Sequence, residues 1–264
     1  MRASLIQLSV DSSESADERR RRAASLARGR TGDDLVVLPE LWTAGAWAYD
    51  RWGYDDEGVD GPTAEIMSAA AREAGTWLHA GSIVERDRDG RLYNTALLFD
   101  RSGELRGRYR KIHRYGFDSG EALLMGGGSD VVTVPTDIGV IGLATCYDLR
   151  FPELFRGLLD AGAELVVVPA AWPAARLSHW QLLTRTRALE EQVFLLACCA
   201  VGTHGGMQQG GHSAIIDPWG TVLGEAGTAE EMVTVDFDMD QVAKIRSELP
   251  VLRDRVLAIE PPPR

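Results

Sequence analysis

The chain has 264 residues and a formal net charge of −11, with 45% hydrophobic and 25% charged residues. This length suits one large domain or two small ones and is ample for a buried core. The acidic balance argues against nucleic acid or an anionic membrane as the main partner, and no run of about 18 apolar residues predicts a membrane span. Only two of the 28 basic residues are lysines, Lys111 and Lys244.

Short apolar runs alternate with polar, helix-like stretches along the first half of the chain. Proline at the first turn and Gly75 at the end bound a helix over residues 62–74, and Asp89-Gly90 joins two strands in a hairpin. In chain order, the expected elements are a strand at 4–10, an arginine-rich helix ending near Arg28, a buried strand at 35–38, the helix at 62–74, and strands at 77–86 and 93–100.

The second half continues this alternation, which predicts an α/β fold. Three prolines at 261–263 predict an extended C-terminal arm over about 259–264. In chain order, we expect strands at 131–134 and 140–144, a helix at 152–159, a strand at 165–168, a helix at 179–191, and strands at 193–201, 213–216 and 221–225.

Two segments of the first half have counterparts in the second half. Residues 32–39 resemble residues 162–169, and residues 96–100 resemble residues 213–217. Two similar halves with their elements in the same order predict two sheets packed face to face with helices outside. Chance similarity between buried strands is the other interpretation. No linker separates the halves, so residues 1–264 are expected to form one domain.

Glu40 and Lys111 are the first two candidates for chemistry, because α/β sheets commonly place their sites at strand ends. Glu40 follows Pro39, which closes the strand at 35–38, and it is either a surface carboxylate or a partly desolvated general base. Lys111 either occupies its position by chance, through neutral drift, or is a cation that stabilises developing negative charge. The choice of lysine over arginine favours the functional interpretation.

Cys146 ends an apolar strand and precedes a helix that begins near Pro152. This strand–turn–helix arrangement would present a thiol at the sheet edge, with the backbone N–H groups that follow free to form an oxyanion hole. Nearby cations would depress the pKa of the thiol and make it a better nucleophile. A small buried hydrophobe is the alternative, and it fits Cys198 and Cys199 better, since polar residues follow Cys146.

The remaining cysteine and histidine patterns are less informative. Three cysteines, two of them adjacent, make a poor disulfide framework and favour a reducing, cytoplasmic setting. The sequence contains no zinc-binding spacing, no Walker A loop and no G-x-G-x-x-G fingerprint. A cysteine–histidine hydrolase is also possible. Its base would be His113, His179, His204 or His212.

Glutamate, lysine and cysteine in this order, each near a strand end, resemble the carbon–nitrogen hydrolase (nitrilase) superfamily. The resemblance runs from the first strand to Asp240. It implies a four-layer α-β-β-α sandwich of two mixed sheets with internal pseudo-symmetry, neither a metal nor an organic cofactor, and a homodimer or higher homo-oligomer. Its motifs are LPELW at 38–42, RKIH at 110–113, CYDLRFPEL at 146–154, VPAAWP at 168–173, HWQLLTRTRALEEQ at 179–192 and GHSAIIDPWG at 211–220.

The resemblance also implies roles for individual residues. Cys146 would attack an amide carbon and form a thioester with release of ammonia. Glu40 would take the thiol proton and pass it to the leaving nitrogen. Lys111 would hold the oxyanion together with the backbone N–H of Tyr147, and Glu121 would position the substrate or the hydrolytic water.

CYDLRFPEL followed by AWP resembles the ω-amidase branch, whose members hydrolyse small 2-oxo acid amides such as 2-oxoglutaramate. Trp172 of the AWP run would lie at the substrate site. Arg150 could hold a substrate carboxylate, but we expect a structural ion pair with Glu153 or another carboxylate. The segment 114–128 departs from the ω-amidases. Sister branches act on N-carbamoyl compounds, deaminated glutathione or nitriles, and a non-catalytic binding or scaffold relative is the alternative from a different class.

Overall fold

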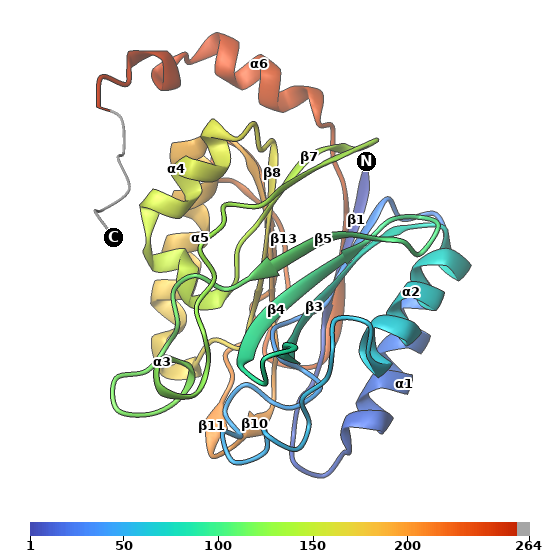
Figure 1. Ribbon diagram of the computed structural model, residues 1–264. Helices are drawn as coiled ribbons and strands as arrows, with labels where there is room; N and C mark the ends of the chain where they lie inside the picture. The colour runs from blue at the N-terminus through green and yellow to red at the C-terminus, as the bar shows by residue number, and fades with distance from the viewer. Residues whose placement is uncertain (258–264) are drawn as a thin grey trace.

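Two six-stranded mixed sheets form the centre of the protein (Figure 1). The computed structural model describes residues 1–257, so the expected arm at about 259–264 lies outside the described residues. Within residues 1–257, every helix is too short or too polar to span a membrane.

The first sheet has the order β14-β1-β2-β3-β4-β5. Its strands β1, β2 and β3 are parallel, and the other neighbouring pairs are antiparallel. The strands are β1 (Arg2–Gln7), β2 (Leu35–Val37), β3 (Trp77–Arg86), β4 (Leu92–Phe99), β5 (Leu105–Arg110) and β14 (Glu231–Asp236).

The second sheet, with the order β13-β12-β9-β8-β7-β6, repeats this pattern. Strands β7, β8 and β9 are parallel, and their flanking neighbours are antiparallel. The strands are β6 (Thr133–Thr136), β7 (Gly139–Leu143), β8 (Leu165–Ala170), β9 (Phe194–Cys199), β12 (Ala214–Ile216) and β13 (Val222–Glu225), and a small separate hairpin is formed by β10 (Thr203–His204) and β11 (Met207–Gln208).

When the two sheets are compared strand by strand, β2 of the first sheet takes the position that β8 has in the second. In the same way, β4 corresponds to β12. These are the strands of the two sequence similarities, residues 32–39 with 162–169 and 96–100 with 213–217. The similarity therefore reflects equivalent places in two halves, and the predicted pseudo-symmetry is confirmed.

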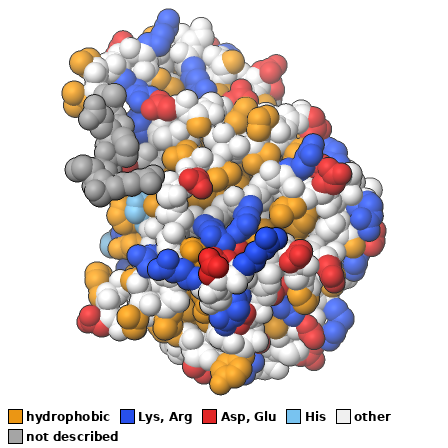
Figure 2. Space-filling view, viewed as in Figure 1, with side chains coloured by type: hydrophobic (Ala, Val, Ile, Leu, Met, Phe, Trp, Pro, Cys, Tyr) orange, Lys and Arg blue, Asp and Glu red, His pale blue; other side chains and the backbone are white. Residues whose placement is uncertain are grey.

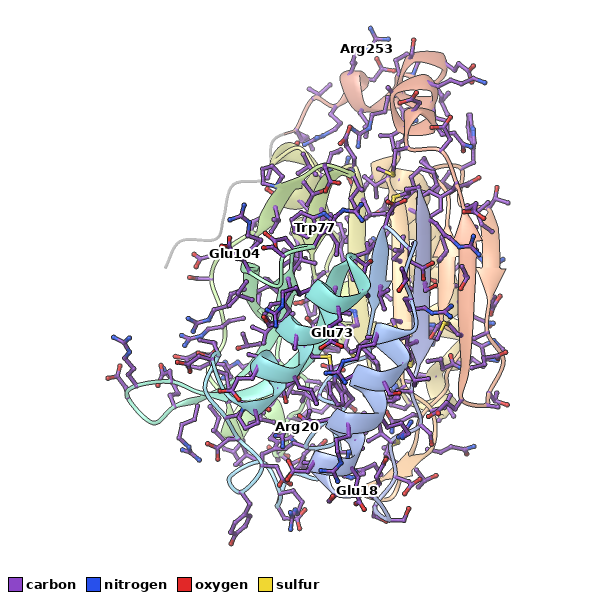
Figure 3. The ribbon with its side chains drawn as sticks, turned by 90° about the vertical axis from the view of Figure 1, so that its right-hand side faces the viewer. Glu18, Arg20, Glu73, Trp77, Glu104 and Arg253 are labelled. Carbon is purple, nitrogen blue, oxygen red and sulfur yellow. The ribbon has the colours of Figure 1, made fainter. Side chains whose placement is uncertain are left out.

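Helices lie on the two outer faces of the paired sheets, which confirms the four-layer sandwich (Figures 1 and 3). Alanines of α1 and α2 pack on the first sheet, while apolar residues of α4 and α5 pack on the second. The helices are α1 (Ala16–Arg28), α2 (Pro62–Ala74), α3 (Glu121–Leu124), α4 (Pro152–Asp160), α5 (Leu177–Glu191) and α6 (Asp240–Glu248), with short 3-10 turns η1 (Cys146–Arg150), η2 (Ala174–Arg176) and η3 (Val251–Asp254).

The space between the sheets is the main hydrophobic core. Leu35 and Val37 of the first sheet belong to one buried cluster with Val167 and Phe194 of the second. Each such side chain stabilises the fold by about 1.5–3 kcal/mol when fully buried. The core thereby holds the ends of β2 and β8 at the same end of the sandwich.

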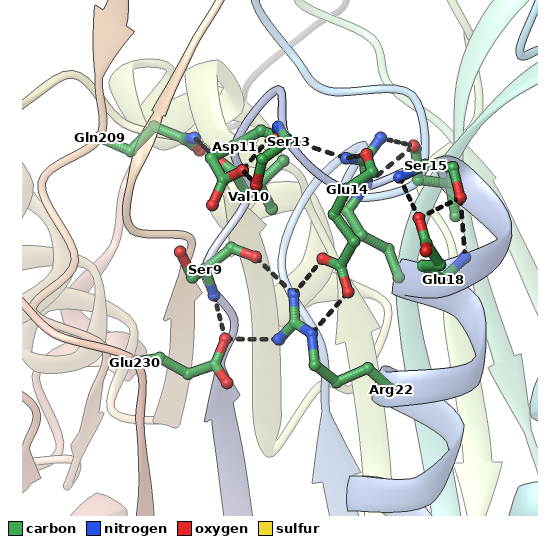
Figure 4. A network of polar contacts seen from close by, with 12 residues as sticks. Ser9, Val10, Asp11, Ser13, Glu14, Ser15, Glu18, Arg22, Gln209 and Glu230 are labelled. Atoms are coloured by element: carbon green, nitrogen blue, oxygen red, sulfur yellow. Dashed lines mark hydrogen bonds and ion pairs between the residues drawn. The ribbon is translucent and has the colours of Figure 1, made fainter.

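The N-terminus of α1 is tied to the first sheet by charged side chains (Figure 4). Ser15 and Glu18 form a capping box that satisfies two free N–H groups of the helix. Arg22 donates to Glu14 at 2.6 Å and to Glu230 at 2.5 Å. Elsewhere on the surface, acidic and basic side chains are interspersed on the face that Figure 2 shows.

Most predicted elements are found with small shifts at their ends. The helix at 62–74 and the strand at 77–86 have the expected bounds, while the first strand ends at Gln7 rather than at residue 10. Strands β5 and β14 were not expected. Both are rich in charged or exposed residues, as is typical of strands near sheet edges, so their apolar alternation is weak.

Candidate active site

Segments that follow β2, β5, β7 and β8 meet in one pocket with about 450 Å³ of space free of protein atoms, part of it open to solvent. The structure brings all of the predicted site residues together in its wall. These residues are Glu40, Lys111, Glu121, Cys146, Tyr147 and Trp172, and Arg150 joins them.

Lys111 lies between two carboxylates in the wall of this pocket. Its Nζ donates to Glu40 Oε1 and to Glu121 Oε2, both at 2.7 Å. Asn94 Nδ2 donates to Glu40 at 2.8 Å and to Glu121 at 2.5 Å. The N–H of Ala171 donates to Glu40 Oε2 at 2.9 Å. These contacts hold both carboxylates and the ammonium in one arrangement.

Burial and charge act in opposite directions on this cluster. Burial lowers the pKa of Lys111, but the charges of Glu121 and Glu40 outweigh it and raise that pKa well above its ordinary value. Lys111 therefore stays protonated at neutral pH. Burial is also the main cause that raises the pKa of Glu121, followed by repulsion from Glu40, while Lys111 opposes both.

Cys146 begins the η1 turn three residues after the last residue of β7, as the strand–turn–helix pattern predicted. Its φ of 47° lies in the left-handed region, which a non-glycine residue adopts only when its surroundings hold it there. The expected depression of the thiol pKa is wrong. Burial and the charge of Glu40 raise the pKa of Cys146 well above its ordinary value and outweigh Lys111.

Aromatic rings also line the pocket. The Tyr115 ring meets Trp47 and Tyr147 edge to face, with ring centroids 5.4 Å and 5.2 Å apart. Trp172 is buried, and its indole N–H donates to the carbonyl of Arg176 at 2.8 Å. With these rings, the exposed lining of the pocket around Cys146 is largely apolar.

Two arginines also line the pocket. The expected ion pair of Arg150 with Glu153 or another carboxylate is wrong: none is found within residues 1–257, and the Arg150 guanidinium lies 4.8 Å from the Trp172 ring centroid. Arg176 donates to the Tyr115 hydroxyl at 2.9 Å and likewise has no carboxylate partner in the described part of the chain. Sequence reasoning missed Arg176, which nothing in its local sequence distinguishes.

None of the four candidate histidines lines this pocket. His113 binds Asp148, His212 binds Glu225 and His179 lies near Arg150, so the cysteine–histidine arrangement is not formed. Cys198 and Cys199 are fully buried, as expected of small hydrophobes. Among residues 1–257, no group of three or more His, Cys, Asp or Glu side chains could hold a metal ion.

Sequence reasoning also missed Asn94 and the N–H of Ala171. Asn94 and Thr95 are polar residues in the mainly apolar strand β4, and this is the one local signal that could have identified Asn94. A backbone N–H leaves no signal in the residue type at all. Its role depends on bringing β8 beside the end of β2.

Comparison with known proteins identifies the family to which the chain belongs. The carbon–nitrogen hydrolase family model matches residues 2–247, and the chain belongs to this family. It is thus a hydrolase of carbon–nitrogen bonds.

Individual proteins of known sequence or structure are similar to this chain over most of its length. A 2-oxoglutaramate amidase of Paenarthrobacter nicotinovorans is 39% identical over 257 residues, covering 95% of this chain and 87% of that protein. A deaminated glutathione amidase of Yersinia enterocolitica is 34% identical, covering 84% and 82%. A carbon–nitrogen hydrolase superfamily protein of Xanthomonas campestris, solved with an arsenic adduct in its active site, has a TM-score of 0.89 and 30% identity over 99% of both chains.

Proposed function

We propose that the protein is an ω-amidase that hydrolyses the terminal amide of a small anionic substrate such as 2-oxoglutaramate. The observation that carries this proposal is the placement of Glu40, Lys111 and Cys146 in one pocket with two arginines that lack carboxylate partners among the described residues. Similarity to a 2-oxoglutaramate amidase over 95% of the chain supports it.

In the first half of the reaction, the Cys146 sulfur attacks the amide carbon while Glu40 takes the thiol proton. A base is needed because the thiol pKa is raised, so little thiolate exists at neutral pH beforehand. Lys111 and the backbone N–H of Tyr147 stabilise the negative oxygen of the tetrahedral intermediate. Glu40 then passes the proton to the nitrogen, ammonia leaves and a thioester remains.

In the second half, water attacks the thioester carbon. Glu40 removes a proton from this water, with Glu121 orienting it through the shared contacts to Asn94 and Lys111. The carbon–sulfur bond then breaks, the carboxylic acid leaves, and the proton held by Glu40 returns to the Cys146 sulfur. The cycle consumes one water and needs no cofactor.

The substrate class follows from the pocket wall. Arg150 and Arg176 offer guanidinium groups to a carboxylate, and guanidinium binds carboxylates through paired N–H donors. A substrate that carries its carboxylate at one end and its amide at the other would place the amide at Cys146. N-carbamoyl amino acids and deaminated glutathione also carry carboxylates, so they are the competing substrates.

Ammonia release should be measured with 2-oxoglutaramate, an N-carbamoyl amino acid, deaminated glutathione, a neutral amide and a nitrile. We expect 2-oxoglutaramate to have the highest kcat/KM and Cys146→Ala to have no activity. An active Cys146→Ala variant would contradict the thioester mechanism. If no compound releases ammonia and iodoacetamide labels Cys146 as slowly as Cys198 and Cys199, the non-catalytic scaffold alternative is favoured.

The arginines are tested separately with Arg150→Met and Arg176→Met. Each variant should raise KM for 2-oxoglutaramate at least about 10-fold and leave KM for the neutral amide unchanged, because only the anionic substrate loses a charged hydrogen bond. Arg185→Met serves as the matched control, since Arg185 is exposed on α5 outside the pocket. An equal change of KM for both substrates would remove the arginines from carboxylate recognition.

We also propose a homodimer in a reducing, cytoplasmic setting. Leu182 and Leu189 of α5 and Trp219 are exposed apolar side chains that a second copy would cover. The three cysteines are free thiols, including the proposed nucleophile. Light scattering of the protein and of Leu182→Glu tests the dimer, and a monomeric native protein would contradict it.

A further inference from the structure

Asp148 is fully buried two residues after Cys146, and its carboxylate receives contacts from four groups. Oδ2 accepts from the Tyr109 hydroxyl at 2.7 Å and from the Thr145 N–H at 2.9 Å. Oδ1 accepts from the His113 N–H at 3.0 Å and lies 2.8 Å from His113 Nδ1. We call Asp148 and these partners the carboxylate clamp.

The carboxylate clamp joins segments that belong to different sheets. Tyr109 lies on β5 of the first sheet, and His113 follows two residues after Lys111. Thr145 directly precedes Cys146 after β7 of the second sheet. One side chain therefore connects the lysine segment to the cysteine segment where the two sheets meet at the pocket.

Cys146 needs such support because its φ of 47° is unfavourable for a residue with a side chain. Three of the four groups that contact Asp148 come from Thr145, which directly precedes Cys146, and from His113, two residues after Lys111. The His113 ring also stacks on Phe151 with centroids 3.7 Å apart, and Phe151 meets the Tyr147 ring of the pocket wall edge to face.

We infer that Asp148 is a positioning residue that holds the Cys146 turn against the Lys111 segment, so that the thiol and the ammonium reach the same substrate carbonyl. The inference rests on the proposed roles of Cys146 and Lys111. Asp148 does not line the pocket, so it acts through these residues rather than on the substrate.

Asp148→Asn keeps the size of the side chain but replaces one acceptor oxygen with a donor group, which opposes the donors around it. We expect kcat to fall about 100-fold with KM within about threefold, because a small misplacement of reacting groups affects the transition state more than binding. Tyr109→Phe removes one of the four contacts and should lower kcat about 10-fold.

Asp217→Asn is the matched control. Asp217 is also a buried carboxylate that accepts two backbone N–H groups of a turn, at 2.9 and 2.8 Å, but it lies outside the pocket. It should lower thermal stability and leave kcat unchanged. All rates are normalised to the folded fraction.

Iodoacetamide alkylation of Cys146 separates this inference from the proposed function. If the wild type hydrolyses none of the amides, the proposed function fails, while slower alkylation in Asp148→Asn would still support positioning. The inference is overturned if folded Asp148→Asn and Tyr109→Phe keep wild-type kcat and alkylation rates, or if Asp217→Asn loses as much kcat. Should Asp148→Asn not fold, Tyr109→Phe alone decides.

Discussion

Two of the places where the protein buries charged side chains differ in how fully those side chains are hydrogen-bonded. In the pocket, all four carboxylate oxygens of Glu40 and Glu121 accept hydrogen bonds, and Lys111 lies between them. Between α4 and α5, Glu191 is only 1% exposed and lies 3.0 Å from Arg156. Neither oxygen of Glu191 accepts a hydrogen bond from any described residue.

The difference between the pocket carboxylates and Glu191 shows how hydrogen bonding affects a buried carboxylate. A buried ion pair is stabilised only when the remaining lone pairs also find donors. Burial raises the pKa of Glu191 to about 7, and Arg156 offsets this only in part. The pocket cluster keeps its ammonium charged and its geometry defined, which the proposed mechanism requires, whereas Glu191 can take up a proton near neutral pH.

The largest effect should come from Lys111→Arg. A planar guanidinium cannot replace a compact ammonium held 2.7 Å from two carboxylates, so we expect kcat/KM to fall about 1000-fold while the protein still folds. Steady-state ammonia release and circular dichroism check this. Lys244→Arg is the control, because Lys244 is 70% exposed and lies 3.9 Å from Glu248. Turnover near that of the wild type in Lys111→Arg would remove Lys111 from the mechanism.

Glu121→Gln should have the next largest effect. It removes one negative charge beside Lys111 and one acceptor of the Tyr115 N–H, so we expect kcat to fall about 100-fold. Single-turnover and steady-state rates with the best amide would show whether formation or hydrolysis of the thioester is slowed. Unchanged rates in both phases would assign Glu121 a purely structural role.

The smallest effect concerns stability rather than activity. The pKa of Glu191 is raised from 4.5 to about 7, so the folded state binds this proton more tightly than the unfolded state, and stability falls as pH rises through that window. From pH 5.5 to 8, this group should remove about 2 kcal/mol from the free energy of unfolding. Urea unfolding at both pH values should show a flatter dependence in Glu191→Gln, with unchanged kcat. An equally steep dependence in the variant would contradict the assignment.

The sequence predicted the catalytic candidates because each leaves a local signal. Glu40, Lys111 and Cys146 stand at the ends of strands, and motifs around them match one superfamily. Asn94, 54 residues from Glu40, and the N–H of Ala171, 131 residues from it, leave no comparable signal. They were missed because their part in the site depends on strand packing rather than on their neighbours.

The sequence by itself determined the α/β alternation and the candidate site residues, and it indicated two similar halves, because apolar periodicity and residue type are local properties. Tertiary structure alone decided the direction in which the pKa of Cys146 shifts and which arginines have no carboxylate partner among the described residues. The thiol pKa rises rather than falls, and Arg150 forms no ion pair within residues 1–257. Both outcomes depend on burial and on charges distant in sequence, which only the packed sheets bring within reach.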